Sequence, residues 1–89
     1  MTIEEMRKEL VKLEELERIA DAAELEYDKF PMDEEKEQAF DDAYKSQYDC
    51  FMNISLAIVE LTRGTVDIAN ARAMVNSKRE QLKKIFKIA

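Results

Sequence analysis

The segment Phe30-Pro31-Met32-Asp33 contains the only proline of this 89-residue chain and separates two long stretches of helical sequence. Proline disfavours the helical conformation in the residue before it, so we expect a helix to end near Phe30. Asp33 is a favourable N-cap, and the Glu34 and Glu35 that follow suit the positive end of a helix dipole. The segment therefore predicts a short turn that joins two helices.

The only glycine of the chain marks a second boundary, at Arg63-Gly64-Thr65. Glycine is the usual residue just past a helix end, and Thr65 can cap the helix that follows. At the N-terminus, Thr2 and Glu5 have the spacing of a capping box. These boundaries predict three helices, at about 2–30, 33–63 and 65–88.

Each predicted helix carries an apolar stripe. Its apolar residues recur at steps of three and four, and no alternating run of useful length predicts a β-strand. We expect one all-α domain over residues 1–89, an elongated up-down-up three-helix bundle that forms homo-oligomers. The alternative is a helical hairpin whose third helix is exchanged with another subunit.

The composition excludes several kinds of active site. The chain has no histidine and one cysteine, Cys50, so neither a His-dependent catalytic triad nor a cysteine-rich zinc site can form. A single glycine is too few for a phosphate-binding loop. We expect no catalytic residues, no cofactor and no metal ion. We expect Cys50 to be structural, with apolar surroundings that raise the pKa of its thiol.

Carboxylates are the one catalytic alternative that the composition leaves open. Acidic residues at steps of three and four, such as Glu14, Glu17 and Asp21, could bind Mg²⁺ as in helical nucleotide hydrolases. With 20 acidic residues in the chain, however, such spacings arise readily by chance. A solvated acidic face is therefore the interpretation that we prefer.

The charges are distributed unevenly along the chain. The net charge is −6, from 14 Lys and Arg against 20 Asp and Glu. Residues 1–63 contain 8 basic and 18 acidic side chains, whereas residues 64–89 contain 6 basic and 2 acidic ones. We expect a cytoplasmic protein with no signal peptide and no membrane partner, and we do not expect duplex DNA as a ligand.

The middle helix has more apolar surface than a simple bundle needs. Besides its core-facing stripe, it carries a second apolar stripe, formed by Tyr48, Met52, Leu56 and Val59. If the middle helix is central, its neighbours on both sides cover this stripe. Alternatively, the stripe is the interface with another copy or with a partner, because large exposed apolar patches usually mark contacts.

Two charged surfaces are further candidates for binding. An acidic face at the start of the middle helix would meet a basic surface of another protein; it consists of Glu34, Glu35, Glu37, Asp41 and Asp42. A basic stripe on the third helix could bind RNA or a nucleotide; it consists of Arg72, Arg79, Lys83 and Lys87. The alternative role of the basic stripe is to complement the acidic first and second helices.

Polar residues also interrupt the predicted core-facing stripes. Counting from the two connections places Glu17 of the first helix and Lys78 of the third at one level of the bundle. We hypothesise that they form an ion pair that sets the register of the helices. In the alternative, Leu16 replaces Glu17 in the stripe and both charges are solvated.

These features predict a non-enzymatic acidic helical module that self-associates and regulates or inhibits a macromolecular partner. The partner would be a protein with a basic surface. One alternative is binding of nucleic acid or a small anionic ligand through the basic third helix of a dimer or higher oligomer. The other is Mg²⁺-dependent nucleotide hydrolysis by helical carboxylates.

Overall fold

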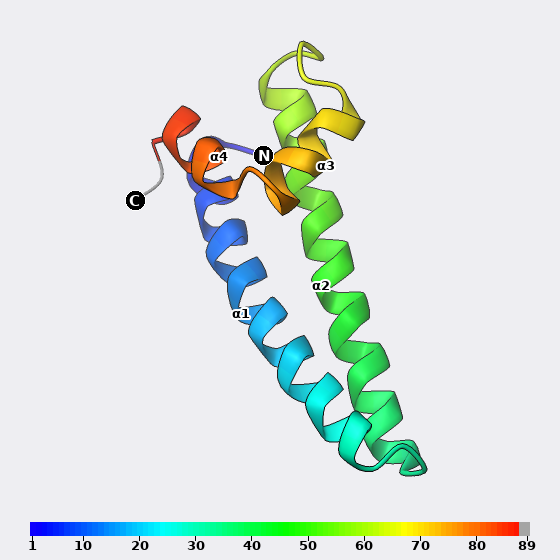
Figure 1. The fold of residues 1–89 in the computed structure, drawn as a ribbon. Helices are drawn as coiled ribbons and strands as arrows, with labels where there is room; N and C mark the ends of the chain where they lie inside the picture. Colours follow the sequence, from blue (N-terminus) through cyan, green and yellow to red (C-terminus); the bar gives the residue numbers. More distant parts are fainter. Residues whose placement is uncertain (88–89) are drawn as a thin grey trace.

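The computed structural model describes residues 1–87 and confirms an all-helical fold over that range. The long helices α1 (Ile3–Lys29) and α2 (Glu34–Leu61) form an antiparallel hairpin (Figure 1). The short helices α3 (Ile68–Asn76) and α4 (Arg79–Ile85) fold back over its open end. The molecule is elongated, with extents of 46 × 23 × 20 Å. Within residues 1–87, no helix is long and apolar enough to cross a membrane.

The turn between α1 and α2 forms where the proline predicts it. Phe30 ends α1 immediately before Pro31. The Asp33 carboxylate then accepts hydrogen bonds from the backbone N–H groups of Glu35, at 3.0 Å, and Lys36, at 3.3 Å. Asp33 is therefore the N-cap of α2, as the sequence predicts.

The other predicted boundaries of the hairpin are also present. The Thr2 hydroxyl accepts from the N–H of Glu5 at 3.1 Å and lies 3.2 Å from the Glu5 carboxylate, so the two residues cap α1. Gly64 follows the end of α2 with a φ of +81°, and its N–H donates to the carbonyl of Val59 at 2.9 Å. A backbone turn of this kind satisfies carbonyls that the helix end leaves unpaired.

The third segment differs from its prediction. We expected one helix over 65–88, but the chain forms α3 and α4, with a break at Ser77 and Lys78. The expected end at residue 88 lies outside the described residues. The start differs too, because the carboxylate of Asp67, rather than Thr65, caps α3 by accepting from a backbone N–H at 2.8 Å.

Burial explains the break. A single straight helix that directed Val75 and Leu82 into the core would carry Lys78 between them on the same face. In the structure both apolar side chains are fully buried, whereas Lys78 is exposed. A helix end leaves backbone carbonyls without hydrogen-bond partners. Arg79 satisfies one of them near the end of α3, because its Nε donates to the Val75 carbonyl at 3.0 Å.

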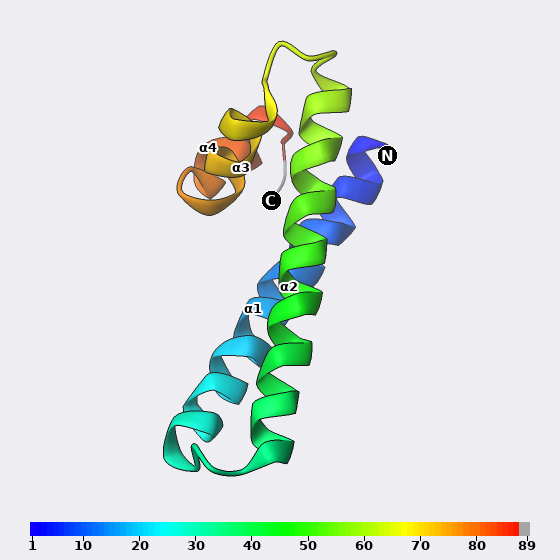
Figure 2. The same cartoon turned by 90° about the vertical axis from the view of Figure 1, so that its right-hand side faces the viewer.

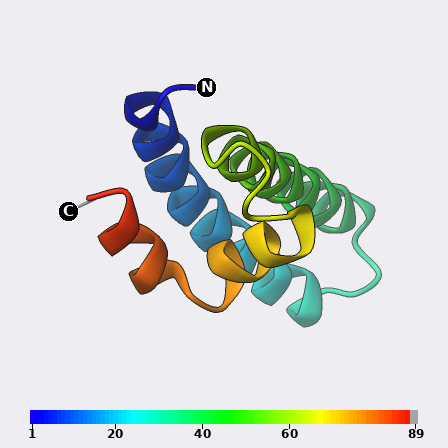
Figure 3. The same ribbon diagram turned by 90° about the horizontal axis from the view of Figure 1, so that it is seen from above.

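The break also means that the predicted up-down-up three-helix bundle does not form. α3 and α4 cover only the open end of the hairpin, and its closed end consists of α1 and α2 alone (Figure 2). Viewed along the hairpin, α3 lies beside α2 and α4 lies beside α1 (Figure 3). Both short helices pack on the hairpin of their own chain.

The hydrophobic core lies at the open end, where all four helices meet. Fully buried side chains come from every helix: Met6, Leu10, Leu13, Ile54, Ile58, Ala71, Val75 and Leu82. Polar contacts reinforce the packing, since the Arg7 guanidinium donates to the carbonyl of Lys87 at 2.9 Å and so joins α1 to the end of α4. Toward the closed end the packing is thinner. There the Tyr27 and Phe40 rings meet, with centroids 5.9 Å apart.

We predict that Leu82→Ala destabilises the protein by about 2 to 4 kcal/mol, because it removes a fully buried side chain that holds α4 on the hairpin. Ile85→Ala on the same helix is the control. Its side chain is half-exposed, so we expect a much smaller loss. Urea unfolding of the two variants measures both values. Similar losses in both would mean that α4 is not held through Leu82.

Candidate functional site

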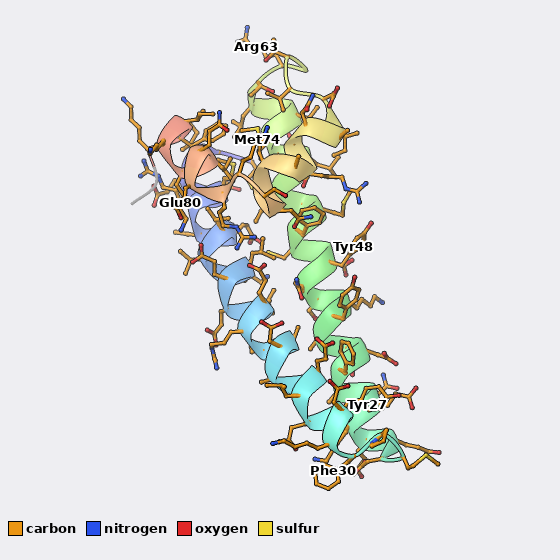
Figure 4. The ribbon with its side chains drawn as sticks, viewed as in Figure 1. Tyr27, Phe30, Tyr48, Arg63, Met74 and Glu80 are labelled. Atoms are coloured by element: carbon orange, nitrogen blue, oxygen red, sulfur yellow. The ribbon has the colours of Figure 1, made fainter. Side chains whose placement is uncertain are left out.

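The closed end of the hairpin presents apolar side chains among carboxylates. Met32 is 92% exposed and Phe30 is 52% exposed. Figure 4 shows Phe30 at this end, directed away from both helices. Residues 24–42, which we call the hairpin tip, contain nine acidic and two basic side chains. The tip is therefore a strongly negative surface with an apolar centre.

All five residues of the predicted acidic face lie in the hairpin tip, and all are exposed: Glu34, Glu35, Glu37, Asp41 and Asp42. The two lysines of the tip contact other tip residues and not these five carboxylates. Lys36 Nζ lies 3.3 Å from Glu26 and 5.2 Å from the centre of the Phe30 ring, and Lys29 Nζ lies 3.8 Å from Glu26. Among the described residues, none of the five carboxylates has an ion-pair partner.

The second apolar stripe of α2 is only partly covered. Met52 and Val59 are half-buried and pack against the core. Tyr48 and Leu56 remain about half-exposed. The four residues therefore do not form one continuous exposed surface, because α1 and α3 pack against α2 and leave only part of its surface open.

The predicted basic stripe is divided by the break between α3 and α4, and part of it is paired with α1. Arg79 forms an ion pair with Glu17, and Lys83 Nζ lies 2.9 Å from Glu14. Arg72, on α3, lies over the Phe51 ring, 5.9 Å from its centre. Lys87 follows the end of α4 and is exposed. The basic third segment thus complements the acidic first helix within one chain.

The prediction that Glu17 pairs with Lys78 is wrong, because the partner of Glu17 is the next residue, Arg79. Glu17 instead binds Arg79 through two hydrogen bonds, of 2.5 and 3.3 Å, with side chains that are 32% and 20% exposed. The break before α4 turns Lys78 toward solvent and Arg79 toward α1. Leu16 also packs against the core, so it and Glu17 both face the interior side of α1.

A pocket of about 200 Å³ lies beside the Glu17–Arg79 pair. We call it the aromatic pocket, because Tyr44, Tyr48 and Phe51 of α2 line it together with Gln47, Arg72 and Asn76. The pocket joins Tyr48 of the predicted apolar stripe to Arg72 of the predicted basic stripe, which the sequence does not bring together. Tyr48 and Arg72 are far apart in the sequence, so no local sequence pattern predicts the pocket.

Cys50 is buried between α1 and α2. Its thiol lies 3.4 Å from the carbonyl of Glu9 and 3.5 Å from the carboxylate of the same residue. Burial raises the pKa of the thiol to about 11, and the neighbouring Glu9 adds to the shift. The expectation of a raised thiol pKa is confirmed, although the charged neighbour that matters comes from the opposite helix.

Within residues 1–87, no three or more His, Cys, Asp or Glu side chains are placed together so that they could hold a metal ion.

Comparisons with protein-family models, with curated proteins and with solved structures find no match to this chain.

We predict that stability falls as the pH rises from 9 to 11 through ionisation of Cys50. The folded-state pKa is raised from 9.0 to about 11, so the neutral thiol stabilises the fold below pH 9 and this contribution is lost as the pH approaches 11. Urea unfolding of the wild type and Cys50→Ala across this range isolates the effect, because other groups titrate in both proteins. If the difference in free energy of unfolding between the two proteins stayed constant from pH 9 to 11, the prediction would be contradicted.

We also predict that the Glu17–Arg79 pair contributes a coupling energy of about 1 to 2 kcal/mol, because both side chains are partly buried and joined by two charged hydrogen bonds. A double-mutant cycle with Glu17→Gln and Arg79→Gln measures it. The control cycle uses Glu15 and Arg18, an exposed pair on α1 for which we expect no measurable coupling. Equal coupling in the two cycles would show that burial of the pair is unimportant.

Proposed function

We propose that this protein is a non-enzymatic interaction module that binds a basic surface of another protein through its hairpin tip. The observation that carries the proposal is the exposure of Met32 and Phe30 in the hairpin tip, whose acidic face has no ion-pair partner within residues 1–87. Protein interfaces commonly combine a few apolar anchors with a polar rim. In this arrangement the two apolar side chains supply affinity, and the acidic residues select the partner.

The acidic face would mainly increase the rate at which the protein associates with its partner. Among the described residues, no lysine or arginine neutralises these carboxylates. They therefore attract a basic partner over distances of about a Debye length, roughly 10 Å at 0.1 M salt. The helices that carry them are already formed, so little backbone ordering is needed on binding. The hairpin tip also lies away from the core, so its side chains can be used for binding without loss of packing.

Regulation follows from the charge of the tip. An acidic projection that covers a basic surface excludes other polyanions from that surface, and nucleic acid is one of them. The module would thereby inhibit or regulate its partner without any chemical step. Self-association through Tyr48 and Leu56 stays a prediction, and these two side chains lie outside the hairpin tip.

The internal ion pairs favour this proposal over nucleic-acid binding by the third segment. Glu17 and Glu14 already compensate the charges of Arg79 and Lys83. Binding phosphates through these residues would require both ion pairs to be broken. The acidic face has no such competing partner among the described residues.

The test is differential capture from a lysate of the source organism, followed by measurement of affinity with the captured protein after purification. We expect Met32→Ser to weaken binding about tenfold or more. We expect Asp41→Asn combined with Asp42→Asn to weaken it in low salt and to reduce its dependence on salt.

The matched control is Asp49→Asn combined with Glu80→Gln, which changes the net charge equally at exposed sites outside the tip. Its binding should equal that of the wild type. If binding survives high salt and both tip variants unchanged, the hairpin tip is not the binding surface.

A further inference from the structure

The aromatic pocket combines side chains from all four helices on a face that the hairpin tip does not include. Tyr44, Gln47 and Tyr48 line it from α2, and Arg72 and Asn76 line it from α3. The Glu17–Arg79 ion pair, which joins α4 to α1, also lines the pocket. This ion pair and the hydrophobic core position the walls of the pocket.

The pocket has a local positive charge although the chain as a whole has a net charge of −6. Arg79 and Glu17 cancel one another through their two hydrogen bonds. Arg72 has no carboxylate within ion-pair distance among the residues that the structure describes, and the Phe51 ring lies beneath its guanidinium. One uncompensated guanidinium therefore lines the pocket, and its planar group of donors suits a carboxylate or a phosphate.

Two of the three aromatic side chains of the pocket are exposed, whereas Phe51 is buried. Tyr44 is 58% exposed and Tyr48 is 46% exposed. The Tyr48 and Phe51 rings lie 6.2 Å apart between centroids, and Arg72 lies over Phe51, so the exposed Tyr48 ring forms an aromatic wall next to Arg72. Flat rings bind such a wall by stacking or by edge-to-face contact. Gln47 and Asn76 add amide donors and acceptors at the same place.

The size of the pocket restricts the ligand. Its volume of about 200 Å³ is below the range of roughly 300 to 1,000 Å³ that is usual for sites of drug-sized ligands. It can hold one ring with a small substituent but not a dinucleotide.

We propose that the aromatic pocket binds a small planar aromatic anion, a single ring that bears one carboxylate or phosphate. The anionic group binds the Arg72 guanidinium, and the ring packs against Tyr44 and Tyr48. This site is independent of the hairpin tip, because it uses none of the residues of the acidic face.

The experiment is a titration of the ¹⁵N-labelled full chain, followed by backbone amide chemical shifts. Benzoate and phenyl phosphate are the probes, and comparing them decides which anionic group the site prefers. Benzamide provides a ring without charge, and acetate and inorganic phosphate provide charge without a ring. We expect saturable shifts near Gln47 and Asn76 with at least one aromatic anion, and binding at least about tenfold weaker for the three incomplete probes.

Variants assign the binding to Arg72. We expect Arg72→Gln to raise the Kd of the preferred probe at least about tenfold, and Tyr48→Ser to raise it as well. Lys84→Gln is the matched control, because it removes one positive charge from an exposed position of α4 that does not line the pocket. It should leave the Kd within about twofold. The spectra themselves show whether each variant is folded.

Three results would overturn the proposal. One is the absence of saturable shifts with both aromatic anions up to roughly 10 mM. Another is that benzamide or acetate binds as tightly as the aromatic anions do. The third is that Arg72→Gln and Lys84→Gln lose the same amount of affinity. The Asp41→Asn and Asp42→Asn variant should bind the probe as the wild type does, so failure at the tip and failure at the pocket are distinguishable.

Discussion

Val75 and Leu82 are completely buried between the open ends of α1 and α2, and the arrangement of the whole molecule depends on this packing. The third segment bends at Ser77 and Lys78, so both side chains reach the core while Lys78 stays exposed. The bend ends α3 after nine residues. It also directs Arg79 toward α1, where it pairs with Glu17. One packing contact thus determines the length, direction and charge pairing of the last two helices.

The same bend separates the molecule into two ends with different physical character. At the open end, four helices share one core, and the basic residues of α4 neutralise carboxylates of α1. At the closed end, only two helices remain, and the carboxylates of the acidic face have no basic segment above them. A full-length third helix would have brought its cations toward this end. The exposed, negative hairpin tip is therefore a consequence of a short α3.

Most of the hairpin could be predicted from the sequence, because local chemistry determines it. Pro31 and Asp33 end one helix and begin the next through interactions within a few residues. The division of the third segment could not be predicted in this way, because Lys78 interrupts the apolar stripe without any proline or glycine to end the helix, and only packing against the hairpin decides whether the helix continues there. The same limit applies to the aromatic pocket, since Tyr48 and Arg72 are brought together only when α3 folds onto α2.

The sequence by itself determined the helical class, the positions of the first two helices, the excess of acid at the start of α2 and the exclusion of histidine chemistry. Each of these depends on composition or on contacts between residues that are close along the chain. Only the tertiary structure decided where the third segment breaks, that Glu17 pairs with Arg79 rather than Lys78, and that Glu9 faces Cys50. These outcomes depend on which side chains compete for one core, and that competition exists only when distant segments are packed together.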